Sequence, residues 1–342
     1  MKKVIVIGGG FAGSAVAKEL EKDFEVTLID TKDFFEFTPG IMRAIVNSDY
    51  VKEIQVLHSR YLRKANVVIG EVKRTDEKNV RVNGGGLGFD YLVICSGSRY
   101  ESPFKEQKVV IATRADNLKN RFEDLKKAKR VVIVGGGPVG VELAGEILDK
   151  YSDKELTIVH SGEKLIERNS AKAIAYAERH LRKKGVRIIF GEKVVEMKKG
   201  VCITDKGTKV KGDVVFLCTG IKPNYEFLKD FDDVLDERNH VKVNEFLQVN
   251  GFENIFAAGD ITAIKEEKTA QNAEREAEIV VKNIRALESG RELKKFESKR
   301  TPQVISLGKW DGIYDNGKIV IIGVIPAFLK WAVKKREMWK KR

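Results

Sequence analysis

Three glycines near the start of the chain have the spacing of a dinucleotide-binding turn. Gly8, Gly10 and Gly13 follow the apolar run VIVI and precede a helical pattern. The first glycine permits a tight bend, the second lets a pyrophosphate approach the backbone, and the third lets the helix pack on the strand. Unpaired N–H groups at the start of the helix then face the phosphates. Asp30 ends the next strand, where its carboxylate can accept the hydroxyls of an adenosine ribose.

A second turn with the same frame is formed by Gly135, Gly137 and Gly140, which follow the run VVIV. The next strand ends in His160, so the carboxylate that favours NADH and repels a 2′-phosphate is absent from that strand end. Two dinucleotide sites in one chain suit the transfer of a hydride from one site to the other. We therefore expect FAD at the first turn and NADH or NADPH at the second.

The loop that follows His160 leaves the choice between NADH and NADPH open. Arg168 and Lys164 are placed to bind a 2′-phosphate, whereas Glu163 is placed to reach a ribose. Both dinucleotides therefore stay candidates for the second site.

The chain contains one structural unit twice, and each copy predicts a strand, a glycine turn, a helix and a second strand. The first copy begins at residues 4–20 and closes with a strand at 89–98, and the second begins at 131–147 and closes at 212–220. Residues 253–262, ENIFAAGDIT, are predicted to return to the first copy as a further strand. The predicted fold class is α/β, with two Rossmann-like dinucleotide-binding domains, the second inserted into the first.

This repeat sets the predicted domain boundaries. They are 1–107 and 224–298 for the two parts of the FAD-binding domain, 108–223 for the NAD(P)H-binding domain, and 299–342 for a C-terminal segment. Within each domain, short alternating runs between turn residues predict an antiparallel meander. The runs are VVIGEV and NVRV in the first domain, and KVVEM and VCIT in the second.

Composition places the chain among globular cytoplasmic proteins. Of its 342 residues 42% are hydrophobic, and they are spread along the chain. The first apolar run breaks at Gly8, too early for a signal peptide. Cys95, Cys202 and Cys218 form no CxxC or metal-ligand spacing, and their odd number argues against a disulfide framework, so no metal site is expected. Cys95 and Cys218 occupy the same position of the two repeats and are predicted to be buried core residues.

The paired glycine turns, the strand ends CSGS and CTG, and the AAGD segment make the chain resemble the two-dinucleotide-binding-domain flavoproteins of the pyridine nucleotide:disulfide oxidoreductase superfamily. The segments FEFTPG (35–40), VHS (159–161) and TAQNAEREA (269–277) resemble those of type II NADH dehydrogenases and of the AMID-like ferroptosis-suppressor flavoproteins related to apoptosis-inducing factor. The branch that uses a redox disulfide is excluded, because FEFTPGIMRA contains no cysteine.

The resemblance assigns roles to residues on the flavin side of the first domain. Asp260 would bind the ribityl chain of FAD, and Ser96 and Gly97 would line the flavin. Gly259 permits close approach of the backbone, although Asp260 would also suit the N-cap of a helix. Gln271 begins a helical pattern whose N-terminus would face the flavin and stabilise negative charge on its reduced form.

Two further residues bear on the reaction that the resemblance implies. Glu142 occupies the position at which type II NADH dehydrogenases place a glutamate near the nicotinamide and the flavin, although an exposed first-turn glutamate would look the same in sequence. Quinone-reducing members carry AQxAxQ, whereas Arg275 replaces the final glutamine here. That replacement weakens the prediction of quinone as the acceptor.

The C-terminal segment combines apolar and basic residues. The apolar run 319–329 is about half the roughly 20 residues needed to span a bilayer. From about 326 to 342 the pattern predicts a basic amphipathic helix, with Trp331 and Trp339 suited to the headgroup layer. This favours association with an anionic membrane surface. Packing of one helix face on the protein body, or on a second subunit in a homodimer, stays an alternative.

These observations predict a cytoplasmic NAD(P)H:quinone oxidoreductase, peripheral on the inner face of the membrane. Hydride from NAD(P)H would reduce FAD, and two electrons would then pass to a quinone near Gln271 and the C-terminal segment. One alternative is a soluble NAD(P)H oxidase. Another enzymatic alternative is a reductase of a small iron–sulfur protein, whose acidic surface would be attracted by the net charge of +13 on this chain. Another is a redox-sensing, nucleic-acid-binding flavoprotein. Nucleic acid is not the expected partner, because basic and aromatic residues interleave only in the C-terminal segment.

Overall fold

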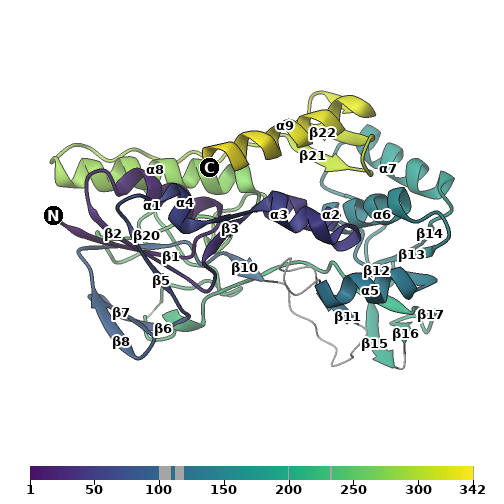
Figure 1. Cartoon of the computed structure of the whole chain (residues 1–342), viewed down its shortest axis with the longest axis horizontal. Coiled ribbons are helices and arrows are strands. Elements are labelled where there is room, and N and C mark those ends of the chain that lie inside the picture. Colours follow the sequence, from purple (N-terminus) through teal and green to yellow (C-terminus); the bar gives the residue numbers. More distant parts are fainter. Residues whose placement is uncertain (100–108, 112–118, 199, 232, 342) are drawn as a thin grey trace.

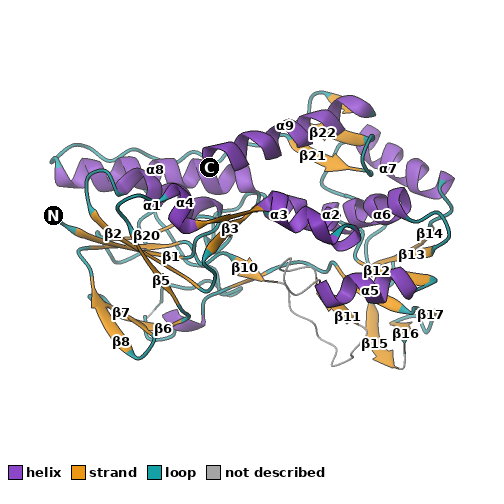
Figure 2. Cartoon of the chain, viewed as in Figure 1, coloured by secondary structure: helices purple, strands orange, loops and turns teal. Residues whose placement is uncertain are grey.

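Two parallel sheets form the centre of the molecule (Figures 1 and 2). The computed structural model describes residues 1–99, 109–111, 119–198, 200–231 and 233–341. The first sheet has the order β20-β9-β1-β2-β5, and its strands are β1 (Lys3–Ile7), β2 (Glu25–Asp30), β5 (Asn66–Ile69), β9 (Tyr91–Ile94) and β20 (Ile255–Ala257). The second has the order β11-β18-β12-β13-β14, and its strands are β11 (Val109–Ile111), β12 (Arg130–Val134), β13 (Glu155–His160), β14 (Arg187–Phe190) and β18 (Val214–Leu217).

The predicted return of residues 253–262 to the first sheet is confirmed, because their strand β20 belongs to that sheet. Its residues pair in parallel with β9, and Phe256 lies opposite Val93. Apolar residues occupy consecutive positions in the central strands because both faces of a parallel sheet are covered. The second unit is therefore inserted into the chain of the first. The predicted boundary at residue 107 lies outside the described residues, and those at 223 and 298 stay predictions.

Helices cover the sheets and connect the two units. In the first unit α1 (Phe11–Leu20) packs along α8 (Ala270–Glu288), and in the second α6 (Pro138–Lys150) follows the glycine turn. Arg43 on α2 (Ile41–Val46) donates to both carboxylate oxygens of Glu146 on α6, so a bidentate ion pair joins the units. The other helices of the two units are α3 (Val51–Ile54), α4 (His58–Tyr61), α5 (Lys119–Lys127) and α7 (Ala171–Lys183).

Each unit carries an antiparallel meander, but the prediction for VVIGEV as a single meander strand is wrong. Its first half belongs to β5 in the parallel sheet, and its second half begins β6. The break falls at Gly70, where a Cβ atom would lie 2.3 Å from the Asn83 side chain. The meander strands are β6 (Val72–Thr75), β7 (Asn79–Val82) and β8 (Gly85–Gly88), and β15 (Val194–Lys198), β16 (Val201–Thr204) and β17 (Lys209–Lys211). Short ribbons are formed by β3 (Phe34–Glu36) with β4 (Gln55–Leu57), and by β10 (Ser98–Arg99) with β19 (Lys222–Pro223).

The C-terminal segment forms a third, small unit that the sequence prediction described only in part. Three antiparallel strands, β21 (Gln303–Ser306), β22 (Gly312–Asp315) and β23 (Val320–Ile322), precede α9 (Val324–Lys340). The apolar run 319–329 is split between β23 and α9 at Gly323, whose φ of 95° favours glycine. In Figure 1, α9 runs from this sheet across the top of the molecule toward α1. Within the described residues no helix combines the length and apolarity needed to cross a bilayer.

Candidate functional site

The first glycine turn joins β1 to α1 and has the geometry that a pyrophosphate requires. Gly8 has φ of 96°, and a Cβ atom on Gly13 would lie 1.8 Å from the Gly8 carbonyl oxygen. Only glycine therefore fits these two positions. Gly10 is exposed, and a Cβ atom there would meet no atom within 4 Å. The surface beside the N-terminus of α1 is thus open for an anion, and the first-turn N–H groups of a helix are available to bind one.

Asp30 lies at the end of β2 beside this turn, as the sequence predicts. Its Oδ2 accepts a 2.7 Å hydrogen bond from the Gly9 N–H and lies 3.5 Å from His58 Nε2. Burial opposes ionisation of Asp30, but the neighbouring His58 and Lys32 outweigh it and hold the pKa of the carboxyl below its usual value. The carboxylate is therefore ionised and able to accept ribose hydroxyls. His58, which the sequence reasoning missed, is fully buried.

The flavin-side residues meet where β9, the β20 loop and the β10–β19 ribbon come together. Ser98 Oγ donates a 2.6 Å hydrogen bond to Asp260 Oδ2, which fixes the direction of the carboxylate. Ser96 Oγ donates to the backbone oxygen of Asn224, the residue that follows β19, so Ser96 is held against the end of the β10–β19 ribbon. Gly97 has φ of 65°, with open space where a Cβ would stand. The structure places Asp260 nine residues before the actual N-cap of α8, Thr269, and so rules out the N-cap alternative.

A buried glutamate on α8 supports the AAGD loop. Glu276 Oε2 accepts a 2.9 Å hydrogen bond from the Gly259 N–H. Burial and the neighbouring Glu266 raise the pKa of Glu276 to about 8, against the opposing charge of Lys268. Sequence reasoning missed Glu276, because a glutamate inside a helical pattern reads as a surface residue. Gln271, five residues before it, is exposed in the first turn of α8.

The second glycine turn repeats the geometry of the first. Gly135 has φ of 112°, and a Cβ on Gly140 would lie 2.0 Å from the Gly135 carbonyl oxygen. A Cβ on Gly137 would meet no atom within 4 Å, so the N-terminus of α6 is open as well. Pro138 is the first residue of the helix, where its missing N–H costs nothing.

The loop that follows β13 places the carboxylate of Glu167 near the end of that strand. His160 packs on Gly136, where a Cβ would lie 2.9 Å from the imidazole ring. Glu167 Oε1 lies 3.9 Å from His160 Nε2 and accepts a 2.9 Å hydrogen bond from the Glu163 N–H. The loop folds back because the Ile166 N–H donates to the Gly136 oxygen at 2.8 Å.

The two cations considered for a 2′-phosphate are placed differently. The Arg168 guanidinium pairs with Glu267 at 3.0 Å to each carboxylate oxygen, and Lys164 is exposed. Glu163 contributes its backbone N–H to Glu167, while its own side chain is exposed. The acidic group held at this strand end is therefore Glu167 rather than the expected Glu163.

Glu142 is buried at the C-terminal unit, so the alternative of an exposed first-turn glutamate is wrong. Its Oε1 accepts hydrogen bonds from the Lys330 ammonium of α9 and, at 3.0 Å, from the Ser306 N–H of β21. The side chains of Glu142 and Lys330 are only 11% and 19% exposed. A buried carboxylate is stable only when it is paired in this way. The pair connects the helix of the second glycine turn to the C-terminal helix.

Cys95 and Cys218 are buried, as predicted, and Cys202 is buried as well. Burial raises the pKa of the Cys95, Cys202 and Cys218 thiols, that of Cys202 to about 11. They are therefore protonated and unreactive at neutral pH. Among the described residues no group of acidic, histidine or cysteine side chains has the arrangement of a metal site.

The residues present fit two dinucleotides. Each glycine turn leaves open space before a helix N-terminus, and each has a carboxylate within reach of the adjoining strand end, Asp30 in one and Glu167 in the other. The His58 Nε2 atom is buried beside Asp30 and has no hydrogen-bond partner within the described part of the chain. A buried polar nitrogen without a partner suits a site where a ligand supplies one.

Known proteins with the same architecture were found by sequence and by structure. The model of the pyridine nucleotide-disulphide oxidoreductase family matches residues 2–277. Apoptosis-inducing factor homolog B of Dictyostelium discoideum is 33% identical, over 94% of this chain and 91% of its own length. Ferroptosis suppressor protein 1 of Homo sapiens is 32% identical, over 91% of this chain and 87% of its own.

The similar solved structures are more distant in sequence and show the fold. NDH2 of Plasmodium falciparum in complex with NADH has a TM-score of 0.87 at 17% identity, covering 100% of this chain and 96% of that chain. The sulfide:quinone oxidoreductase of Aquifex aeolicus has a TM-score of 0.86 at 20% identity, covering 100% and 92%. With its two dinucleotide turns and these matches, the chain belongs to the pyridine nucleotide-disulphide oxidoreductase family and is an FAD-dependent NAD(P)H oxidoreductase.

Proposed function

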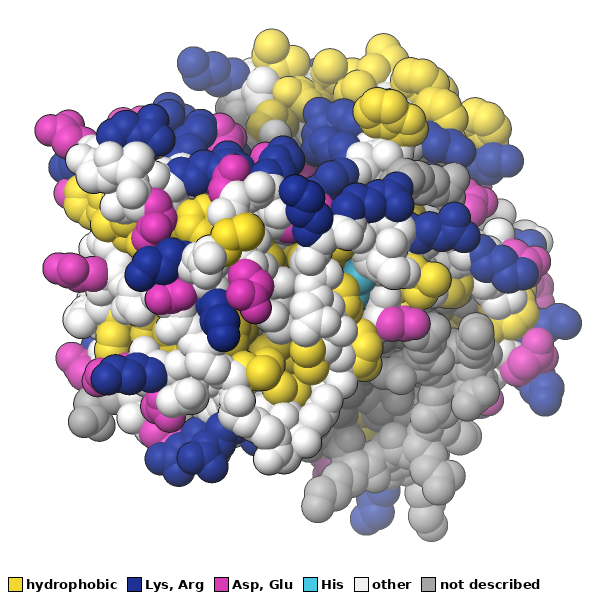
Figure 3. All heavy atoms as spheres, turned by 60° about the vertical axis from the view of Figure 1, so that its left-hand side comes forward, with side chains coloured by type: hydrophobic (Ala, Val, Ile, Leu, Met, Phe, Trp, Pro, Cys, Tyr) yellow, Lys and Arg dark blue, Asp and Glu magenta, His cyan; other side chains and the backbone are white. Residues whose placement is uncertain are grey.

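We propose that the chain is an NAD(P)H:quinone oxidoreductase that works peripherally on the inner face of a membrane. The observation that carries this proposal is an apolar ridge on the C-terminal unit. The ridge comprises Ile319, Val324, Ile325, Phe328, Trp331 and Trp339, each between 47% and 79% exposed. Figure 3 shows apolar side chains gathered along the top of the molecule, where α9 and its sheet lie in Figure 1.

The ridge is exposed because α9 turns four of its charged side chains inward, while Lys335, Arg336 and Lys340 stay exposed beside it. Lys334, Glu337 and Lys341 are each 5% exposed or less, and Lys330 pairs with Glu142. A helix that only covers a water-soluble body does the opposite and buries its apolar face. Exposed aromatic residues with flanking lysines are suited to the interface of an anionic bilayer.

The relatives support a quinone as the acceptor. One structural neighbour is a sulfide:quinone oxidoreductase, and the ferroptosis suppressor protein is a sequence relative. FAD, when bound, takes a hydride from the nicotinamide and releases the electrons to a second substrate. The chain contributes the glycine turns that orient the two dinucleotides, Asp260 and Gln271 on the flavin side, and the buried Glu142–Lys330 pair under the ridge.

The proposal is tested by removing the ridge aromatics together, as Phe328→Ser, Trp331→Ser and Trp339→Ser. Burial of each aromatic side chain is worth roughly 1.5–3 kcal/mol, so partition onto anionic liposomes is expected to fall by at least about 100-fold. Reduction of long-chain ubiquinone held in the liposomes should fall in parallel. The rate with a short, water-soluble ubiquinone analogue should change less than about twofold, because FAD and NADH bind elsewhere.

Trp310→Ser provides the matched control. Trp310 is 66% exposed in the β21–β22 turn, beside Lys309, whose N–H bonds Asp149 of α6. This variant should bind liposomes normally. Equal liposome binding by the triple variant would remove the membrane proposal, and turnover with oxygen but with no quinone would favour an oxidase. Retarded migration of DNA with negligible turnover would favour the nucleic-acid-binding sensor.

We further propose that the second site prefers NADH, because Glu167 places a negative charge at the end of β13. A 2′-phosphate there would be repelled, and Arg168 is engaged with Glu267. Glu167→Gln should lower the ratio of kcat/KM for NADH to that for NADPH by about ten-fold, which corresponds to about 1.4 kcal/mol. Glu163→Gln, with its exposed side chain, is the control and should leave the ratio within twofold. A ratio unchanged by Glu167→Gln would remove this assignment.

A further inference from the structure

A series of buried side chains runs from the end of α9 to the carboxylate beside the first glycine turn. Its members are Lys341, Ser14, Tyr61, His58 and Asp30, and each is 9% exposed or less. They come from α1, β2 and α4 of the first unit and from the residue that caps α9. The function proposed above uses only Asp30 of this series, as a ligand of the FAD ribose, so the arrangement does not depend on which electron acceptor the protein uses.

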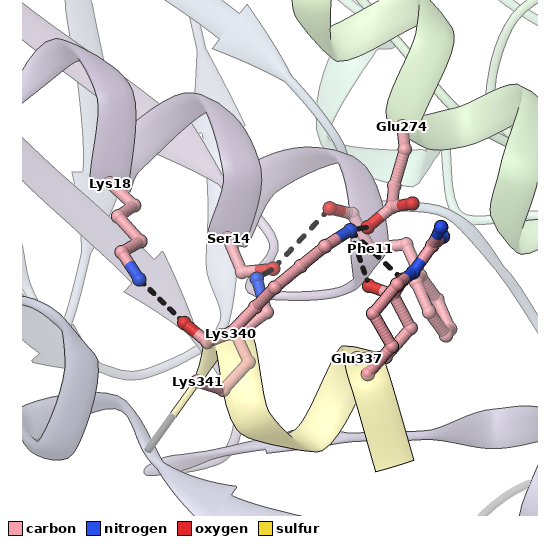
Figure 4. A network of polar contacts seen from close by, with 8 residues as sticks. Phe11, Ser14, Lys18, Glu274, Glu337, Lys340 and Lys341 are labelled. Atoms are coloured by element: carbon pink, nitrogen blue, oxygen red, sulfur yellow. Dashed lines mark hydrogen bonds and ion pairs between the residues drawn. The ribbon is translucent and has the colours of Figure 1, made fainter. Parts of the chain in front are cut away.

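The series begins where α9 meets the first unit. Lys341 Nζ donates a 2.6 Å hydrogen bond to Ser14 Oγ in the first turns of α1, and it lies 4.9 Å from the ring centroids of both Phe35 and Tyr61. The neighbouring Lys340 backbone oxygen accepts a 2.5 Å bond from Lys18 Nζ. Figure 4 shows Lys341 reaching Ser14 of α1, while the Lys340 side chain points to Glu274 of α8. The end of α9 is thus fixed on the two helices that start at the FAD site.

The series continues from Tyr61 to Asp30. Tyr61 Oη lies 2.5 Å from His58 Nδ1, and His58 Nε2 lies 3.5 Å from Asp30 Oδ2. That Oδ2 atom accepts the Gly9 N–H within the glycine turn. His58 and Tyr61 are the two ends of α4, a single turn of helix. A helix this short is not stable by itself, so the position of both side chains depends on what packs against them.

His58 completes the adenosine end of the FAD site. Its ring packs on Gly9, where a Cβ would lie 2.4 Å from His58 Cε1 and 2.5 Å from Asp30 Oδ2. Its Nε2 atom is buried without a hydrogen-bond partner among the described residues. Because Nε2 faces Asp30 Oδ2 at 3.5 Å, a ribose bound by that carboxylate would lie beside this nitrogen and could bond it.

We propose that His58 is a positioning residue for FAD, and that Lys341 holds it in place through Tyr61, so that docking of α9 and retention of FAD strengthen one another. The ammonium of Lys341 fixes the Tyr61 ring from one side, and the Tyr61 hydroxyl fixes the His58 ring. Coupling of this kind is reciprocal, since FAD must stabilise docked α9 by the same factor by which docked α9 stabilises FAD.

Two variants of similar side-chain size each remove one interaction of the series, so the two interactions can be tested separately. Tyr61→Phe removes the hydroxyl that meets His58, and Lys341→Met removes the ammonium that meets Tyr61 and Ser14. Each is expected to speed FAD dissociation from the holoprotein by about five-fold, the loss of one buried hydrogen bond. Release is measured by the rise of flavin fluorescence on dilution. Lys334→Met is the matched control, because Lys334 is a buried lysine of α9 that pairs with Glu53 and lies over Tyr50, away from Tyr61.

The reciprocal measurement is amide hydrogen exchange at the end of α9. In the unaltered chain, adding FAD to deflavinated protein should slow exchange across residues 336–341, and Tyr61→Phe should abolish most of that slowing. Lys334→Met should leave FAD dissociation within twofold. The proposal is overturned if FAD slows exchange equally with and without the Tyr61 hydroxyl. It is also overturned if Lys334→Met releases FAD as fast as Lys341→Met does, because α9 would then act only by covering the surface.

Discussion

Gly137→Asp is expected to raise the KM for NADH by at least about 100-fold while FAD stays bound. The reason is that Gly137 has ordinary backbone angles and open space where its Cβ would stand, so aspartate fits without strain. Its carboxylate would lie where the helix N-terminus receives the pyrophosphate. Two like charges about 4 Å apart near a protein surface repel by roughly 4 kcal/mol, more than the 2.7 kcal/mol that 100-fold requires.

The measurement combines initial rates over a range of NADH concentrations with the flavin absorbance of the purified protein. Gly137→Ala is the control for bulk alone, and its KM should stay within about threefold, since its Cβ meets no atom. Gly10→Asp makes the same change at the first turn, where a Cβ also meets open space, and should instead yield protein without FAD. If Gly137→Asp lost FAD, or if Gly10→Asp kept it, the assignment of the two turns would be reversed.

The sequence alone predicts the two turns because their chemistry is local. The three glycines, the strand before them and the carboxylate after them all lie within one strand–turn–helix–strand segment. The geometry at each of these positions admits few residue types. Gly8 and Gly135 have positive φ, and Gly13 and Gly140 lie against backbone, as the pattern requires. The repeat likewise predicts that residues 253–262 return to the first sheet, because that sheet needs a further strand.

Contacts between side chains of distant segments could not be predicted, because they correspond to no local sequence pattern. The partner of Glu142 is Lys330, and the cation beside the Tyr61 ring is Lys341. Glu167 replaces the missing strand-end carboxylate only because the loop after β13 folds back on Gly136. The order of residue types shows charges and helical periodicity, but not which helix face meets the body.

The C-terminal helix illustrates this limit. Its pattern predicts an amphipathic helix with lysines apart from the aromatic residues, and the structure has such a helix. A basic face would ordinarily be solvated. Here Lys330, Lys334 and Lys341 each find an acidic or aromatic partner on the body, so these three lysines lie on the inner face, whereas Lys335 stays exposed. The apolar face is left outside, which no local signal could decide.

The second large effect is expected from Lys330→Met, which should lower the stability of the holoprotein by about 3 kcal/mol. The change removes the cation and leaves the Glu142 carboxylate buried beside an apolar side chain. Removing one partner of a buried pair costs roughly 3–5 kcal/mol when burial is complete, and the lower value suits a pair that is slightly exposed. At roughly 2–4 °C per kcal/mol, the apparent Tm should fall by about 6–12 °C.

Lys335→Met is the matched control, since Lys335 is an exposed lysine on the same helix and its loss should cost less than about 0.5 kcal/mol. The double variant Glu142→Gln with Lys330→Met should recover most of the lost stability, because the amide oxygen of glutamine still accepts the Ser306 N–H and no charge is left unpaired. Melting curves of the four proteins decide the matter. If the double variant melted as low as Lys330→Met alone, the loss would come from packing of the lysine stem rather than from the stranded carboxylate.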